Sequence, residues 1–338
     1  MANEMSLPAR EFILDNGVKG KVLDTGVILF EPDCKTDTDL VFSSAIHGNE
    51  TAPIEIVNGF IARILSGELT LAQRVLFIFG NPPAMNIGKR FVDYNLNRLF
   101  SGTHGLSPEE AFSTSPSDDI TAEHIRAAKL EQYIADFFQS QPEGRKRIHY
   151  DLHTAIRDSK REKFAVYPFL FGEPWSKEVL EFLHRSDVNT VMLMHEPATT
   201  FAFYSSSKMK ALALTIELGK VYPFGQNDLS RMQAIQDNIE CLLCAKEWRS
   251  EDFDVASIDT YVVHQSINRD TENFVLHFDD DVKNFTDFPK GYVLATDDGK
   301  EHCIDQDGEL IVFPNANVQL GHRAILTIVP LDITNKVV

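Results

Sequence analysis

The feature that most constrains the fold is an alternation of apolar strand-like runs with helix-like segments, which continues to about residue 248. The strand-like runs lie at residues 40–42, 75–79, 148–152, 164–169, 190–194 and 212–216. Apolar residues recur near the helical period in residues 51–66, 125–138 and 227–248. This alternation is typical of α/β domains, so we expect a mixed, largely parallel sheet flanked by helices.

The pattern changes after residue 248. Short β runs are separated by turns rich in Asp, Asn, Gly and Pro, and they lie at residues 261–263, 274–276, 292–294, 311–313 and 324–326. We therefore expect an α/β domain over residues 1–249 and a smaller all-β domain over residues 250–338. A chain of 338 residues is long enough for both domains to bury a core.

The charge balance excludes several classes of partner. The chain has 32 Lys and Arg against 50 Asp and Glu, a formal net charge of -18, which disfavours nucleic acid and anionic membranes. The content of 43% apolar and 24% charged residues is typical of a soluble globular protein. We expect a small-molecule partner, and an anionic one requires positive charges placed locally in the site. The sequence predicts no particular oligomeric state.

The chain is expected to be cytoplasmic. Its first residues show no basic region followed by an apolar core, and no apolar run approaches the ~20 residues of a membrane span. The four cysteines form no disulfide framework, which favours a reducing compartment. Cys241 and Cys244 have the spacing of a zinc or redox pair, but they fall in a helical pattern without a second pair, so we expect a buried helix face.

A candidate metal site begins at the first strand-to-helix junction. His47 and Glu50 follow the apolar run 40–42, and small residues around them allow the backbone to approach an ion. Because His₂Glu is a ligand set of catalytic zinc, a second histidine is required, and His153 ends a later strand-like run. The alternative is that the His-x-x-Glu pattern arose by chance and that His153 only caps a strand.

Two carboxylates accompany these candidate ligands. Glu217 interrupts the apolar run 212–218, and a buried carboxylate needs a partner or a function, so it is a candidate proton acceptor. Its alternative is a solvated strand end. Asp151, two residues before His153, could orient the metal site, since histidine ligands usually donate their other N–H to a carboxylate or a carbonyl.

Arginines and amides alternate in residues 89–100. Arg90, Asn97 and Arg98 suit recognition of a carboxylate, because a guanidinium binds carboxylates through two parallel hydrogen bonds. The same segment could be an ordinary charged surface. The chain lacks the Gly-x-Ser-x-Gly, phosphate-binding Gly-x-x-x-x-Gly-Lys-Ser/Thr and His-Glu-x-x-His motifs of other hydrolases and nucleotide-binding proteins.

Taken together, these motifs resemble the succinylglutamate desuccinylase and aspartoacylase family of zinc carboxypeptidase-like amidohydrolases, over nearly the whole chain. The segments that carry the resemblance are His47-Gly48-Asn49-Glu50-Thr51, Gly80-Asn81-Pro82-Pro83-Ala84, Asn97-Arg98-Leu99-Phe100, Asp151-Leu152-His153-Thr154-Ala155 and Glu217-Leu218-Gly219-Lys220. Residues 151–157 and 223–229 are most similar to the bacterial members that remove a succinyl group. Relatives often carry Asp where this chain has Asn95, so no role is assigned there.

The resemblance implies a role for each candidate residue. It implies a carboxypeptidase-like α/β domain with a C-terminal β domain, and one Zn²⁺ per chain held by His47, Glu50 and His153. It implies that Glu217 is the general base and that Arg90 polarises the scissile carbonyl. Asn97 and Arg98 would bind a substrate carboxylate. Arg157 could bind another, or it could be a surface residue.

The implied reaction is hydrolysis of N2-succinyl-L-glutamate to succinate and L-glutamate, the last step of bacterial arginine degradation by the succinyltransferase route. One alternative is an aspartoacylase-like or carboxypeptidase-like zinc hydrolase that acts on another N-acyl amino acid or on a peptide. A second alternative, of another class, is a zinc-binding protein without catalytic activity. Glu217 and Arg90 argue against the second, because a closed structural zinc site needs neither an open position nor a base.

Overall fold

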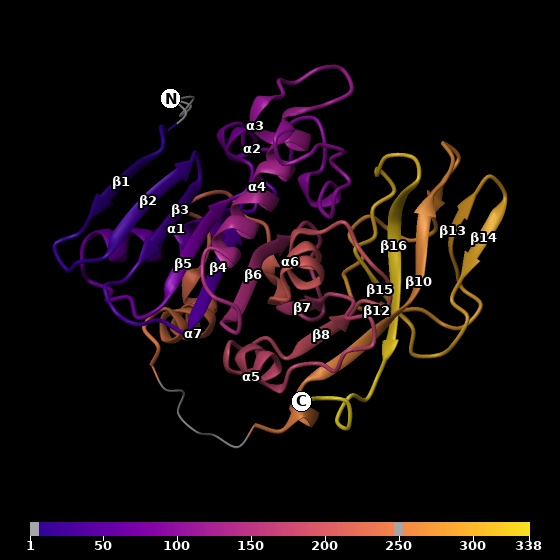
Figure 1. Ribbon diagram of the computed structural model, residues 1–338. Coiled ribbons are helices and arrows are strands. Elements are labelled where there is room, and N and C mark those ends of the chain that lie inside the picture. Colours follow the sequence, from indigo (N-terminus) through magenta and orange to yellow (C-terminus); the bar gives the residue numbers. More distant parts are fainter. Residues whose placement is uncertain (1–6, 247–252) are drawn as a thin grey trace.

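The computed structural model describes residues 7–246 and 253–338, and one large mixed sheet runs through it (Figure 1). Its 13 strands are, in spatial order, β1 (Arg10–Ile13), β2 (Lys19–Asp24), β3 (Val27–Glu31), β5 (Arg74–Phe79), β4 (Thr38–Ser44), β6 (Lys146–Ala155), β9 (Leu212–Lys220), β7 (Phe164–Tyr167), β8 (Thr190–Leu193), β10 (Asp259–Arg269), β16 (His322–Pro330), β15 (Leu310–Val312) and β12 (Thr286–Asp287). A small second sheet contains β11 (Val275–Leu276), β13 (Val293–Asp297) and β14 (Lys300–Cys303).

Helices cover both faces of the central strands. They are α1 (Thr51–Leu65), α2 (Pro82–Asn86), α3 (Glu110–Ser113), α4 (Ala122–Gln139), α5 (Lys177–Arg185), α6 (Phe201–Met209) and α7 (Gln233–Leu243), with the short 3₁₀ helices η1 (Leu96–Arg98), η2 (Leu229–Met232) and η3 (Val255–Ser257). None of the helices in the described part of the chain has both the length and the apolar character needed to cross a membrane.

Parallel pairing lies at the centre of the sheet. Strands β5, β4, β6 and β9 are mutually parallel, and so are β7, β8 and β10, while β7 pairs antiparallel with β9. Both edges, formed by β1 to β3 and by β16, β15 and β12, are antiparallel. The predicted α/β class with a mixed sheet, flanking helices and a C-terminal β domain is confirmed.

The central strands are apolar throughout because both of their faces are buried. In β4, Leu40 and Phe42 point into a core that they share with α1, α5 and α7, whereas Val41 points into the core on the side of α4 and α6. All three side chains are at most 1% exposed. Each such buried side chain contributes roughly 1.5–3 kcal/mol to folding, so this strand is a firm base for the residues that follow it.

Several elements differ from the sequence expectations. The helix expected over 227–248 is divided into η2 and α7, and the loop expected over 101–122 contains the short helix α3. The sequence analysis did not predict helices α5 and α6 or strands β1 to β3, because these elements are short. In addition, α6 is rich in aromatic and Ser residues, which have modest helix propensity. The expected domain boundary between residues 249 and 250 lies outside the described residues.

The C-terminal strands extend the large sheet rather than forming a detached module. Strand β10 pairs parallel with β8 and antiparallel with β16. Phe164 and Met192 of the α/β part share a core with Tyr261 and Phe285. The C-terminal strands can therefore contribute one wall of a pocket whose other wall comes from the α/β part.

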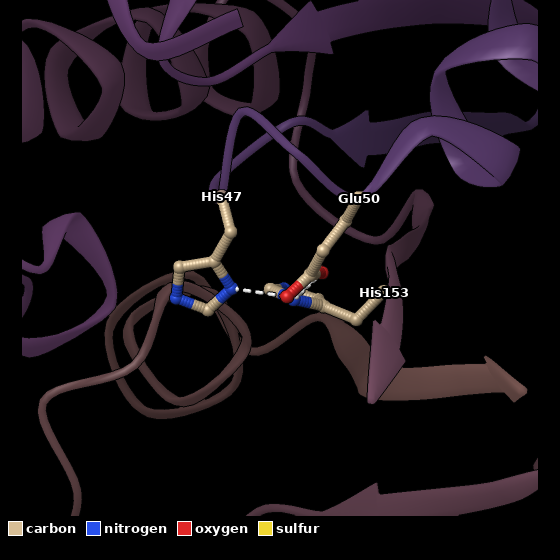
Figure 2. A group of neighbouring side chains, drawn as sticks. All are labelled: His47, Glu50 and His153. Carbon is tan, nitrogen blue, oxygen red and sulfur yellow. Dashed lines mark hydrogen bonds and ion pairs between the residues drawn. The ribbon is translucent and has the colours of Figure 1, made fainter. Parts of the chain in front are cut away.

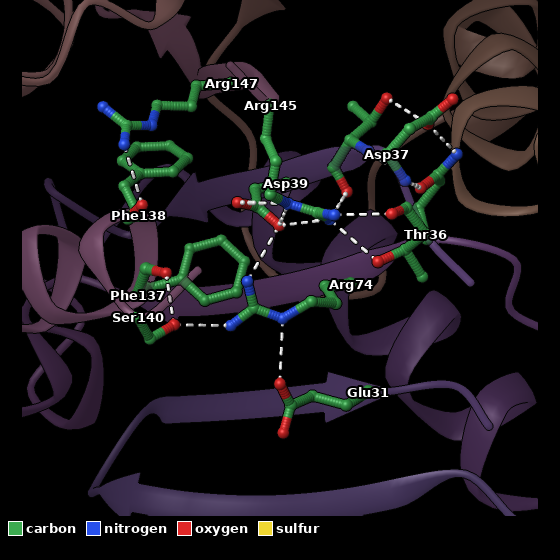
Figure 3. A network of polar contacts seen from close by, with 12 residues as sticks. Glu31, Thr36, Asp37, Asp39, Arg74, Phe137, Phe138, Ser140, Arg145 and Arg147 are labelled. Carbon is green, nitrogen blue, oxygen red and sulfur yellow. Dashed lines mark hydrogen bonds and ion pairs between the residues drawn. The ribbon is translucent and has the colours of Figure 1, made fainter. Parts of the chain in front are cut away.

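A buried polar network ties together the amino ends of β4, β5 and β6 (Figure 3). Asp39 is fully buried and accepts hydrogen bonds from Arg74 Nη1 at 2.9 Å and from Arg145 Nη2 at 2.8 Å. Arg74 also donates to Glu31, whose side chain is 38% exposed, and to Ser140. The network fixes the end of the sheet that lies opposite the carboxyl ends of these strands.

Replacing Asp39 by Asn is expected to lower the free energy of unfolding by about 3–5 kcal/mol, because the buried guanidinium of Arg74 and the partly buried one of Arg145 lose their shared counter-charge. Urea unfolding followed by circular dichroism measures this loss. Glu31→Gln is the matched control, since it removes a half-buried charged partner of the same network and should cost about 1 kcal/mol or less. Equal effects of the two substitutions would show that the buried carboxylate does not organise this end of the sheet.

Candidate metal centre and active site

The candidate site lies where the carboxyl ends of β4, β6 and β9 meet. These strands are adjacent and parallel, and their register places His153 of β6 directly beside Glu217 of β9. The turn that carries His47 and Glu50 follows β4 at the same edge. Open α/β sheets bind ligands at this edge, so topology alone brings four of the predicted residues together.

Close backbone contact fixes the turn between β4 and α1. A Cβ atom added to Gly48 would lie 2.3 Å from the backbone of Ala84 and Met85, so only glycine fits there. The Gly48 N–H donates to the carbonyl oxygen of Arg90 at 3.0 Å. Glu50 then occupies the N-cap position of α1, where the positive end of the helix dipole favours its negative charge.

His47, Glu50 and His153 form one compact group (Figure 2). His47 Nδ1 lies 2.7 Å from Glu50 Oε1, and His153 Nδ1 lies 2.9 Å from Glu50 Oε2. The ligand atoms of the three side chains lie within 4.8 Å of one another, and each residue is at most 3% exposed. Two imidazole nitrogens and one carboxylate are the donors of a His₂Glu metal site.

The outer nitrogens of both imidazole rings have partners as well. His47 Nε2 lies 3.0 Å from Asn95 Oδ1, and His153 Nε2 lies 2.8 Å from Asp151 Oδ2. An oxygen acceptor at Nε2 keeps the proton on that nitrogen, so Nδ1 of a neutral ring can bind a metal. The donor set therefore fits a zinc ion. Asn95 has a contact at the site although the sequence comparison assigned it no role.

Glu50 is surrounded by donors. Besides the two histidines, Arg90 Nη1 donates to it at 2.7 Å and the Thr154 N–H donates at 3.1 Å. Burial alone would raise the pKa of Glu50, but His47 and His153 outweigh it and hold the pKa well below the usual value. This carboxylate is therefore ionised at neutral pH, as a metal ligand must be.

A chain of buried polar groups extends behind His153. Ser43 Oγ donates to Asp151 Oδ1 at 2.6 Å and lies 2.7 Å from His149 Nε2, whose Nδ1 lies 2.7 Å from Ser205 Oγ. Sequence reasoning missed His149 and Ser205. The alternation of His149, Asp151 and His153 on one face of an otherwise apolar strand was the available indication, because residues two apart share a face.

Glu217 lies in the same pocket and is only 7% exposed. Its Oε2 atom has no hydrogen-bond partner among the described residues. Burial raises the pKa of Glu217 to about 7, an effect that His153 and Arg90 oppose and that Glu50 reinforces. A carboxyl group with this pKa can accept and return a proton near neutral pH.

One pocket gathers nearly all of the predicted site residues. Its lining includes His47, Arg90, Asn97, Arg98, His153, Arg157 and Glu217. The C-terminal strands and loops contribute Asn284 and eight residues, which are 313–315, 317–319 and 322–323. Glu50 lies just beneath this surface, bonded to His47 and His153. The pocket thus has His47, His153 and Glu217 at one end, together with several guanidinium groups.

The predicted substrate-binding residues also have partners within the protein. Asn97 Oδ1 accepts from the Phe201 N–H at 3.0 Å, and Arg98 Nη1 donates to the Asn97 carbonyl at 2.8 Å. Arg157 donates to the carbonyls of Pro314 at 2.8 Å and Asp280, which are in the C-terminal part. Arg157 therefore holds the two parts together here, and its binding of substrate stays a prediction.

Family models and a curated relative match the sequence of this chain over most of its length. The family model of the succinylglutamate desuccinylase/aspartoacylase catalytic domain matches residues 36–243, and that of the AstE/AspA barrel-sandwich hybrid domain matches residues 256–331. The chain is 49% identical over 326 residues to the succinylglutamate desuccinylase of Shewanella piezotolerans, covering 96% of this chain and 92% of that one.

Solved structures of the same family have the same fold. Succinylglutamate desuccinylase from Vibrio parahaemolyticus superposes with a TM-score of 0.85 at 34% identity, covering 98% of this chain and 93% of that one. Murine aminoacylase 3 shares the fold at a TM-score of 0.57 and 17% identity, with 88% and 97% coverage. The chain thus belongs to the succinylglutamate desuccinylase and aspartoacylase family of hydrolases, enzymes that act on acyl amino acids.

Proposed function

We propose that this chain hydrolyses N2-succinyl-L-glutamate to succinate and L-glutamate, with one zinc ion held by His47, Glu50 and His153. The observation that carries the proposal is the buried Oε2 atom of Glu217, which has no hydrogen-bond partner in the described part of the chain and lies beside the three possible metal ligands. Relatives named succinylglutamate desuccinylase, which are similar over nearly the whole chain, support the choice of substrate. A non-catalytic zinc protein, the alternative, would not explain why the carboxylate of Glu217 is buried beside the possible metal ligands.

The chain's own residues account for the proton transfers. Zinc, when bound, supplies Lewis-acid activation of a water molecule and of the scissile carbonyl. Glu217 takes a proton from the attacking water and returns it to the nitrogen of the leaving glutamate. Arg90 stabilises the negative charge that develops on the carbonyl oxygen, and its contact with Glu50 keeps the guanidinium beside the metal ligands.

Local positive charge is required to bind this substrate, because its three carboxylates meet a protein of net charge -18. Asn97 and Arg98 are proposed to bind one carboxylate, with Arg157 as a further candidate. Arg98 and Arg157 both reach the pocket surface. We further propose that the enzyme acts in the cytoplasm, in the last step of bacterial arginine degradation by the succinyltransferase route.

A direct comparison of substrates tests the proposal. Purified zinc-loaded protein should hydrolyse N-succinyl-L-glutamate with a higher kcat/KM than N-acetyl-L-aspartate or a peptide with a free C-terminus, because only the first carries an acyl carboxylate for the guanidinium groups. Release of the free amino acid is the measurement. A higher kcat/KM for either of the other compounds would overturn the substrate assignment.

His153→Ala is expected to abolish both zinc retention and hydrolysis, because it removes one of three ligands. Elemental analysis after gel filtration measures the zinc content, which should be close to one per chain in the wild type. His277→Ala is the control, since it removes an exposed histidine of the C-terminal part that lies outside the pocket and outside both groups of possible metal ligands. Full zinc occupancy in His153→Ala would remove His153 from the site.

Glu217→Gln is expected to keep the fold and the zinc content while turnover falls by roughly 10²–10⁴-fold, because the amide cannot accept the proton. Elemental analysis and steady-state kinetics on the same preparation separate the two effects. Loss of zinc together with activity would make Glu217 a metal ligand, and near-normal turnover would make it a structural residue.

A further inference from the structure

Glu123 is a buried carboxylate that the proposed mechanism does not use. It lies in the first turn of α4 and is only 1% exposed. Its Oε1 atom accepts hydrogen bonds from the N–H of Val92 at 2.8 Å, the N–H of Asp93 at 3.3 Å and the side-chain amide of Asn81 at 3.3 Å. Its Oε2 atom has no hydrogen-bond partner within residues 7–246 and 253–338. Burying a carboxylate against uncharged donors is costly, which points to a function for the segment that it holds.

The segment that Glu123 holds, residues 87–95, joins α2 to η1 without regular secondary structure. The side chains of Lys89, Val92 and Asp93 are exposed, so their packing cannot fix the middle of the segment. Successive backbone N–H groups, such as those of Val92 and Asp93, form a small concave site for an anion. The positive end of the α4 dipole also favours the negative charge of Glu123. The carboxylate therefore fixes the backbone in the middle of this segment.

Residues on both sides of this fixed point contact the candidate metal ligands. Arg90 Nη1 donates to Glu50 Oε1 at 2.7 Å, and Asn95 Oδ1 lies 3.0 Å from His47 Nε2. The N–H groups that are bonded to Glu123 belong to residues between Arg90 and Asn95. A shift of the backbone there would therefore displace the guanidinium of Arg90 from its place beside the metal ligands.

We propose that Glu123 is a positioning residue for the hydrolysis: by binding the backbone N–H groups of Val92 and Asp93, it holds the guanidinium of Arg90 where the carbonyl oxygen becomes negative. This inference rests on the proposed function, because it needs the role given there to Arg90. Such stabilisation depends on geometry, and a misplacement of about 1 Å can lower the rate by about 100-fold. Glu123 is buried and does not line the pocket, so it acts on the reaction through Arg90.

Helix α4 also offers a matched control. Glu131, further along the same helix, accepts hydrogen bonds from another pair of successive N–H groups, those of Ser101 and Gly102. Neither these two residues nor Glu131 line the pocket. The two carboxylates thus hold neighbouring loops through the same kind of contact, and Arg90 lies only in the loop that Glu123 holds.

Three substitutions test the inference with N-succinyl-L-glutamate as the substrate. Glu123→Gln keeps the shape but removes the charge, so kcat should fall by about tenfold or more, the usual effect of losing a charged hydrogen bond, while KM and zinc content change little. Glu123→Asp keeps the charge but is too short to reach both N–H groups, so it should lose a similar factor, and it replaces Glu123→Gln if that variant does not fold. Glu131→Gln should keep the wild-type kcat. An unchanged kcat in the Glu123 variants, or an equal fall in Glu131→Gln, would overturn the inference.

A double-mutant cycle shows whether Glu123 acts through Arg90. Arg90→Ala alone should lower kcat by roughly 10²–10³-fold, as the loss of one oxyanion donor does. Adding Glu123→Gln to Arg90→Ala should lower kcat by less than about twofold further, because the side chain that Glu123 positions is already absent. An equal fall in the presence and in the absence of Arg90 would show an independent structural effect and overturn the inference.

A crystal structure of Glu123→Gln, or of Glu123→Asp if the first does not fold, separates this inference from the proposed function. In comparison with the wild type in the same zinc-loaded form, the guanidinium of Arg90 should be displaced from its position beside Glu50. An unmoved Arg90 would overturn the inference while leaving the proposed function intact. If the wild type hydrolyses none of the compounds in the substrate comparison, the proposed function fails, and the position of Arg90 in this structure alone decides the inference.

Discussion

The carboxylate of Glu50 is the group on which the architecture of this site depends. Its two oxygens contact two imidazole rings, the guanidinium of Arg90 and a backbone N–H, and the residue occupies the N-cap position of α1. A buried carboxylate without such partners would be too costly to keep charged. The fold supplies these partners by bringing the carboxyl ends of β4, β6 and β9 to one edge of the sheet. The contacts of Glu50 with His47 and His153 therefore both stabilise the site and arrange its possible metal ligands.

The sheet itself is secured at its opposite end. Asp39 and the arginines around it hold the amino ends of β4, β5 and β6 in register, and apolar side chains fill both faces between the two ends. A one-residue slip would turn every side chain of a strand to the other face. Register in this region therefore determines whether His153 lies beside Glu217. The polar network around Asp39 and the candidate active site thus lie at opposite ends of the same strands, and the register of those strands connects them.

The sequence was sufficient to predict the α/β class and the residues that the structure gathers at the site, since apolar strands followed by polar residues mark the carboxyl edge of a sheet. It was not sufficient for contacts that depend on pairing between distant segments. The contact of Asn95 with His47 and the chain from Asp151 to His149 depend on which strands are neighbours. Arg323 is separated from Arg98 by most of the chain, and only the continuous sheet places both in one pocket. Short elements such as α5 carry too few residues for a periodic pattern to stand out.

The central claim is that a metal site with three protein ligands stands beside a free carboxylate. A crystal structure of the zinc-loaded wild-type protein, with anomalous diffraction data at the zinc edge, tests it most directly. The account predicts a single anomalous peak in each chain, bonded to Nδ1 of His47, a carboxylate oxygen of Glu50, Nδ1 of His153 and one ligand that is not protein, with Glu217 near that ligand but not bonded to the metal. A peak coordinated by Glu217 as a fourth protein ligand, or a peak elsewhere in the molecule, would contradict it.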